Sequence, residues 1–169
     1  MATPPAPAGY RRFLMKSKLG VGRDFTVLDP DTEAQLFLVD GKLGARPSAE
    51  VLDANGAVVY SIKGKMLGIP KKLTISDAAG TDVAWLKAKA FSIVKDRMDL
   101  EVASGEPWHL QGSFMEKNYT VSSGDRTVVQ ITQKWVTIRD AYTVDVADDA
   151  DAALALAIVW AVDRWIERD

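Results

Sequence analysis

The chain has 169 residues, 47% of them hydrophobic, which suits a single domain with a sizeable core. It contains no cysteine, which excludes disulfides, thiolate metal sites and cysteine nucleophiles and favours a cytoplasmic location. The net charge of −2 is unevenly divided: residues 1–139 carry 19 basic and 15 acidic side chains, and residues 140–169 carry 2 and 8. The body is therefore mildly basic and the tail acidic.

The first nine residues, Met1 to Gly9, are expected to form a disordered leader. They contain three prolines and no charged side chain, so they lack the basic head and the apolar stretch of a signal peptide. Residues 10–169 are expected to form one domain.

A repeat of two-strand units runs through most of the chain. Successive units align on Lys18, Lys42, Lys65, Lys89, Ser113 and Lys134, at steps of 24, 23, 24, 24 and 21 residues. Each unit has an alternating apolar run, a short turn, a second alternating run and then a turn rich in Asp, Gly or Asn, as in "VYSIKGKMLGIPKKLTISDAAG". Alternation with period two between such turns is typical of short antiparallel strands. Six units therefore predict twelve strands.

The alternation also predicts which side chains of each first strand face inward. One face is consistently apolar, so it is expected to line the core. Its members are Phe13, Met15 and Leu19; Phe37, Val39 and Leu43; Tyr60, Ile62 and Met66; Ala84, Leu86 and Ala90; Trp108, Leu110 and Phe114; and Val129, Ile131 and Trp135.

The last element is an apolar helix, expected from about Asp149 to about Ile166. Residues Ala152 to Val162 are eleven consecutive apolar residues of good helix-forming type. A membrane span needs about 20 apolar residues, so burial inside the protein is favoured. Because a barrel of twelve strands leaves a lumen that must be filled, the helix is expected to occupy it.

These features together resemble the LURP-one-related family. The phrases "VDGKL", "FSIVKD", "VTIRD" and the closing "ALALAIVWAVD" carry the resemblance, which extends from Tyr10 to Ile166. The resemblance implies the fold of the tubby C-terminal domain and the phospholipid scramblases, a twelve-stranded antiparallel barrel around a hydrophobic C-terminal helix. It implies no established enzymatic activity; among the relatives, tubby domains bind phosphoinositide headgroups and scramblases are associated with lipid movement. This chain lacks a cysteine-rich palmitoylation tract, so scramblase activity is not expected.

Residues for catalysis or for metal binding are few. His109 is the only histidine, and its position in the alternation predicts an exposed strand residue. The acidic group Asp145, Asp148, Asp149 and Asp151 lacks the ligand spacing of a calcium loop and is assigned to capping and to the dipole of the helix. We therefore expect no enzyme, no cofactor, no metal and, at pI ≈ 5.5, no nucleic-acid partner.

The outer face of the first strands carries recurring lysines. Those of consecutive units, Lys63, Lys65, Lys87 and Lys89, are the predicted binding patch, to which Lys71 and Lys72 add from a neighbouring turn. Such a band could hold phosphate groups. The alternative is a solvated face whose lysines discourage pairing between strand edges.

Two hypotheses about function follow. The first is a binding module for an anionic phospholipid or a phosphoinositide-like headgroup, peripheral at a membrane surface. The second is a barrel scaffold that a protein partner recognises, with no lipid ligand.

Overall fold

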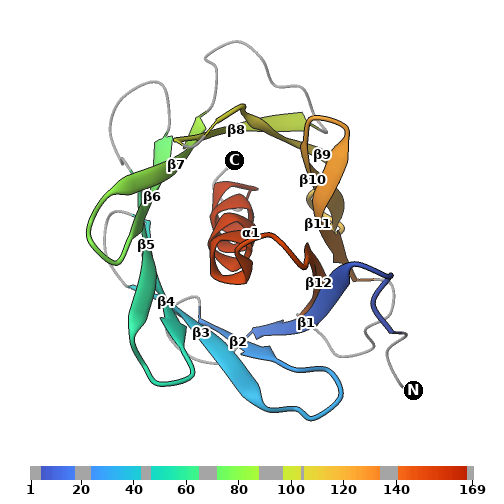
Figure 1. Ribbon diagram of the computed structural model, residues 1–169. Coiled ribbons are helices and arrows are strands. Elements are labelled where there is room, and N and C mark those ends of the chain that lie inside the picture. Colours follow the sequence, from blue (N-terminus) through green and yellow to red (C-terminus); the bar gives the residue numbers. More distant parts are fainter. Residues whose placement is uncertain are drawn as a thin grey trace.

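The protein is a closed antiparallel β-barrel with one helix along its interior (Figure 1). The structure is a computed structural model, and it describes residues 5–17, 24–42, 47–64, 72–87, 97–103, 105–133 and 141–166. Within these ranges the strands are β1 (Tyr10–Ser17), β2 (Phe25–Leu28), β3 (Gln35–Gly41), β4 (Ser48–Asp53), β5 (Val58–Gly64), β6 (Lys72–Asp77), β7 (Asp82–Lys87), β8 (Arg97–Val102), β9 (Trp108–Ser113), β10 (Asn118–Ser123), β11 (Arg126–Thr132) and β12 (Ala141–Ala147), followed by the helix α1 (Ala152–Ile166).

The ring closes where the first strand meets the last. Each strand pairs with its neighbour in sequence, and β1 pairs with β12 from Tyr10↔Ala147 to Lys16↔Ala141. The twelve-stranded barrel and its antiparallel pairing are therefore confirmed. The repeat also appears in the turns: the side chains of Asp53 and Asp77 each accept two backbone N–H groups from the turn that follows.

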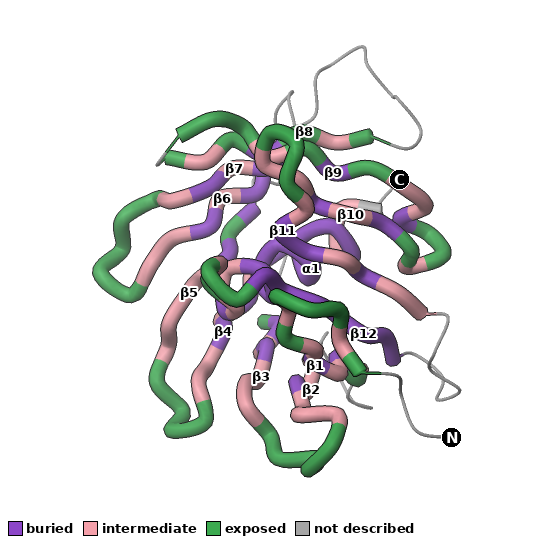
Figure 2. Tube along the Cα trace, turned by 45° about the vertical axis from the view of Figure 1, so that its right-hand side comes forward, coloured by how far each residue is buried: buried purple, intermediate pink, exposed green. Residues whose placement is uncertain are grey.

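The predicted inner faces line the barrel interior. Phe13, Met15, Val39, Ile62 and Ile131 are fully buried, and Figure 2 shows buried residues alternating with others along the strands. The expected inner residues Leu19, Leu43, Met66, Ala90 and Trp135 lie outside the described residues.

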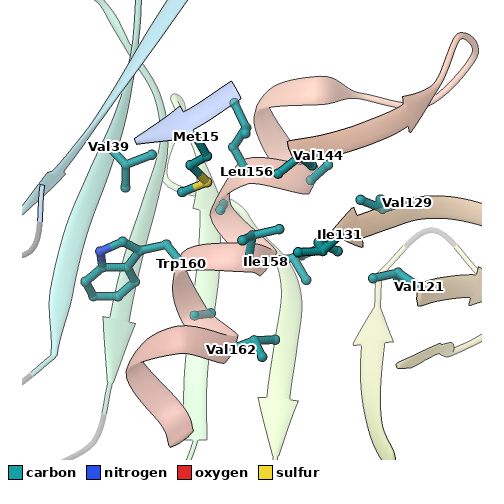
Figure 3. Packing of buried hydrophobic residues seen from close by; sticks show 14 of the residues in the cluster. Met15, Val39, Val121, Val129, Ile131, Val144, Leu156, Ile158, Trp160 and Val162 are labelled. Carbon is teal, nitrogen blue, oxygen red and sulfur yellow. The ribbon is translucent and has the colours of Figure 1, made fainter. Parts of the chain in front are cut away.

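The helix α1 is the centre of the core, and its first residue follows an N-cap. Asp151 accepts the Leu154 N–H at 3.2 Å with its side chain and the Ala155 N–H at 3.1 Å with its carbonyl. Leu156 and Ile158 are at most 1% exposed. Figure 3 shows Ile158 pointing toward Ile131, while Trp160 points to the side of the barrel where Val39 lies. Among the described helices, none is long and apolar enough to cross a membrane.

Four hairpins share a β-bulge that the alternation did not predict. In β2–β3, β4–β5, β6–β7 and β10–β11 the pairing skips one residue near the turn. The skipped residues are Leu36, Val59, Val83 and Val128, which are all apolar and pack against the core. Because a bulge bends a strand and increases its twist, the four bulges bend strands at the end of the barrel where α1 begins.

The strand β12 is buried on both faces, which corrects one expectation. Asp145, expected among the acidic residues that cap the helix, points outward and is 3% exposed. The Arg12 side chain covers it, with Nε and Nη2 donating to the two carboxylate oxygens at 2.7 and 2.8 Å. This hydrogen bonding raises the pKa of Arg12. Asp145 therefore joins the first strand to the last, and only Asp151 caps the helix.

Candidate functional site

The outer face of β5, β6 and β7 brings three lysines together. Lys63 is exposed between the buried residues Ile62 and Gly64, so it points away from the core. Lys72 begins β6 and is paired across the strands with Lys87, the last residue of β7. We call Lys63, Lys72 and Lys87, with Thr74 and Trp85, the lysine face.

A small residue and an aromatic residue complete the lysine face. Thr74 lies in the register between Lys63 on one side and Trp85 on the other. Lys72 Nζ lies 6.0 Å from the centroid of the Trp85 ring, within the range of a cation–π interaction. Trp85 is half-buried on the outer wall, between the buried inward-facing residues Ala84 and Leu86. The lysine face thus presents cations, a hydroxyl and an amphipathic ring on one surface.

Ion pairing distinguishes Lys63 and Lys72 from Lys42 and Lys117, although not from the exposed Lys16 of β1, which has no carboxylate partner among the described residues either. Lys42 Nζ lies 2.6 Å from Asp40 and 3.0 Å from Glu50, which also raises its pKa. Lys117 Nζ lies 2.5 Å from Asp163. In the described part of the chain, no carboxylate forms an ion pair with Lys63 or Lys72. No described carboxylate therefore neutralises these two lysines.

The predicted patch is only partly within the described residues. Lys65, Lys71 and Lys89 lie outside them, and of Lys87 only the backbone is placed. Lys72 was expected in a turn, but it is the first residue of β6, the second strand of its repeat unit. The structure also weakens the alternative role in edge protection, since a closed barrel has no edge strand to protect.

Comparison with known proteins supports the family resemblance. The family model described as LURP-one-related matches residues 11–163. The chain belongs to the LURP-one-related family. A crystal structure of a protein from Arabidopsis thaliana is similar to this LURP-one-related chain, with a TM-score of 0.65 at 17% identity over 96% of this chain and 93% of the other. At that identity the likeness shows the fold alone. No functionally curated protein has a significantly similar sequence.

The single histidine of this LURP-one-related barrel lies in a row that contains the residue types of a hydrolase triad. His109 pairs across the strands with Asp99 and with Ser122, and its Nδ1 lies 2.8 Å from Asp99 Oδ1. The side chains of His109 and Asp99 are 59% and 60% exposed, and no hydrogen bond among the described residues joins Ser122 to His109. The exposed position predicted for His109 is confirmed, and the row has the character of a surface pair.

The acidic residues near the start of α1 have separate partners. Asp149 forms an ion pair with Arg126, and Asp151 accepts a hydrogen bond from the Tyr60 hydroxyl at 2.5 Å. Burial, followed by the contact with Asp151, raises the pKa of Tyr60. Within the described ranges, no group of three or more His, Asp or Glu side chains is placed to hold a metal ion.

Charge is sorted along the barrel axis in a way that the sequence pattern did not reveal. We call the end where α1 begins the acidic end and the end where α1 finishes the lysine end. All six lysines of the described residues lie at the lysine end, because each falls at the corresponding end of a strand or in the turn beyond it. Among the described residues, the acidic end carries eleven carboxylates and two arginines, and the lysine end eight cations and five carboxylates. At the acidic end these are Asp29, Asp31, Glu33, Asp53, Asp77, Asp82, Glu106, Asp125, Asp148, Asp149 and Asp151, with Arg11 and Arg126. At the lysine end they are Lys16, Lys42, Lys63, Lys72, Lys87, Arg97, Lys117 and Arg164, with Asp24, Asp40, Glu50, Glu116 and Asp163.

Inside the lysine end, a buried carboxylate fixes the last turns of α1 to the wall. Asp163 is 6% exposed and accepts hydrogen bonds from Lys117 Nζ at 2.5 Å and from the Tyr142 hydroxyl at 2.7 Å. The nearby Tyr119 hydroxyl is buried and has no hydrogen-bond partner. Burial, followed by the charge of Asp163, raises the pKa of Tyr119. The group joins α1 to β12 and to the turn between β9 and β10.

Proposed function

We propose that this protein is a non-enzymatic barrel that binds an anionic phospholipid or a phosphorylated headgroup through the lysine face, peripherally at a membrane surface. One observation carries the proposal: Lys63 and Lys72 have no carboxylate partner among the described residues, whereas Lys42 and Lys117 have theirs. Cations on a strand surface that no described carboxylate neutralises supply the charge and the N–H donors that phosphate oxygens accept hydrogen bonds from.

The composition of the lysine face fits a headgroup better than a simple anion. The ring of Trp85 is amphipathic, and such rings favour the level of the headgroups at a membrane surface. Thr74, in the register between Lys63 and Trp85, adds a hydroxyl that donates or accepts a hydrogen bond. The resemblance to the fold of tubby domains and phospholipid scramblases adds the expectation that this protein acts at membranes.

The absence of catalysis is part of the proposal. The barrel interior is occupied by α1, which packs with the surrounding wall in one hydrophobic cluster. The one histidine lies on the solvated outer wall, bonded to Asp99. Neither place brings together a nucleophile, a base and an enclosed position for a substrate, which is what catalysis in such a fold requires.

The proposal is tested with two variants that remove the same amount of charge. Lys63→Gln/Lys72→Gln alters the lysine face, and Arg11→Gln/Arg126→Gln, at the acidic end, is the matched control. Sedimentation with phosphatidylcholine vesicles that contain phosphatidylserine should show the first variant binding more weakly by up to ~2 kcal/mol, a factor of ~30, and the control by little. Equal losses would show that net charge alone decides binding.

A second arm separates a lipid surface from a free headgroup. A soluble inositol phosphate is added as a competitor to protein that is bound to the vesicles. Release of the protein shows that the headgroup alone is recognised, and continued binding shows that the membrane surface is required. If the unaltered protein binds neither anionic vesicles nor inositol phosphate, the proposal fails and the alternative, a scaffold for a protein partner, is favoured.

A further inference from the structure

A protein with a net charge of −2 is repelled on average by an anionic membrane, so its orientation decides whether it binds. The two ends of the barrel differ in charge: among the described residues, eleven carboxylates and two arginines lie at the acidic end, against eight cations and five carboxylates at the lysine end. An orientation that brings only the lysine end close to the membrane keeps the attraction and avoids most of the repulsion.

The length of the barrel makes this separation effective. The seven residues of β5 span about 20 Å along the strand, or roughly 15 Å along the axis when the strands tilt by ~40°. At physiological ionic strength the Debye length is ~8 Å, so charges at the acidic end are about two Debye lengths from a surface that touches the lysine end. Their repulsion is then largely screened.

An apolar residue points to the same end. Met115 lies in the turn between β9 and β10 at the lysine end and is 76% exposed, the one large hydrophobic residue exposed in the described part of the chain. The strands β9 and β10 are the third and fourth around the twelve-stranded ring from β6, the middle strand of the lysine face, so the turn lies just over a quarter of the ring away. A barrel lying on its side along β5 to β7 would therefore hold Met115 away from the membrane, whereas a barrel standing on its lysine end would bring Met115 and the lysine face to the surface together.

We infer that the barrel stands end-on at an anionic lipid surface, with the lysine end and Met115 against the headgroups and the acidic end directed away. This inference rests on the proposed binding of anionic lipid. It adds an orientation, an apolar contact and a reason why a net acidic chain binds a surface of its own sign of charge.

Labels at two positions test the orientation. Because the chain has no cysteine, Met115→Cys and Ala54→Cys each provide one site for a fluorophore. Ala54 is exposed in the turn between β4 and β5, at the acidic end but on the side of the barrel next to β5. The vesicles contain phosphatidylcholine, phosphatidylserine and a lipid that carries a nitroxide quencher on its headgroup.

End-on binding predicts that quenching of the Met115 label exceeds quenching of the Ala54 label several-fold. Similar quenching of both labels, or stronger quenching at Ala54, would overturn the orientation while leaving headgroup binding intact. If neither labelled protein sediments with the vesicles, and the unlabelled chain also does not, the proposed function fails and the inference fails with it.

Salt dependence gives a second and independent measurement. Asp31→Asn/Asp125→Asn removes two exposed charges from the acidic end. At physiological ionic strength this variant should bind vesicles within about twofold of the unaltered chain, because the Debye length is ~8 Å. At 0.01 M ionic strength, where the Debye length is ~30 Å, it should bind several-fold more tightly. Strong tightening already at physiological ionic strength would show that the acidic end lies close to the surface, and would contradict the inference.

Discussion

Replacing Leu156 by alanine tests whether the helix is the structural core of the barrel. Leu156 is fully buried in α1, and Figure 3 shows it beside Met15 and Val144 of the wall. Leucine and alanine have similar helix propensities, so the cost comes from the lost packing and from the cavity. For a fully buried leucine this is about 3 to 5 kcal/mol, a large share of a total stability of about 5 to 15 kcal/mol.

The assay is urea unfolding followed by circular dichroism, with thermal unfolding in parallel. Leu156→Ala should lower the midpoint at an unchanged slope, and a loss of this size corresponds to a melting temperature lower by roughly 6 to 20 °C. Leu154→Ala is the matched control, because Leu154 lies in the same helix but is only partly buried. We expect the control to lose less than half as much. A loss below about 1 kcal/mol for Leu156→Ala, or equal losses for the two variants, would refute the central role of the helix.

Two further predictions use matched pairs. Tyr142→Phe should destabilise the protein by about 1 to 3 kcal/mol because it removes a hydrogen bond to the buried Asp163, whereas Tyr119→Phe should be neutral or stabilising because its hydroxyl has no partner. Since the pKa of Tyr119 is raised in the folded state, its contribution to stability is complete below the ordinary tyrosine pKa of ~10 and is lost as the pH rises above it, so Tyr119→Phe should reduce alkaline unfolding. Urea titrations at neutral and alkaline pH check both predictions. Equal changes in stability for the two variants would contradict them. Gly112→Ala should cost several kcal/mol in the same assay, because φ is +134° and a Cβ would lie 2.6 Å from the Asn118 carbonyl oxygen. Gly56→Ala, at φ +82° with nothing within 4 Å of a Cβ, should cost only about 1 to 2 kcal/mol. Similar losses for the two variants would show that the backbone around Gly112 moves to accommodate the Cβ.

The sequence predicted the strands and the helix because both are encoded locally. Alternation placed Phe13, Met15 and Ile131 on the inner face, and the uninterrupted apolar run predicted the helix. The bulges at Leu36, Val59, Val83 and Val128 could not be predicted, since an apolar residue beside a turn fits a regular strand equally well. The role of Asp145 was missed for a different reason: its partner Arg12 is 133 residues away, and only the closure of the ring brings the two together.

The lysine face was predicted in outline, from the outward parity of Lys63 and Lys87. The sequence did not show which lysines form ion pairs with carboxylates. The difference between Lys42, paired with Asp40 and Glu50, and Lys63, which has no such partner among the described residues, depends on the register between strands. The sorting of charge between the two ends also depends on the direction of each strand in the closed ring, which periodicity alone does not give.

The binding of anionic lipid by the unaltered chain is the central claim, and sedimentation with vesicles measures it most directly. The protein is mixed with phosphatidylcholine vesicles, with or without phosphatidylserine, at low and high salt. The account predicts binding only to the anionic vesicles, falling as salt rises because the attraction is electrostatic. Equal binding to both kinds of vesicle, binding that does not change with salt, or no binding to either would contradict it.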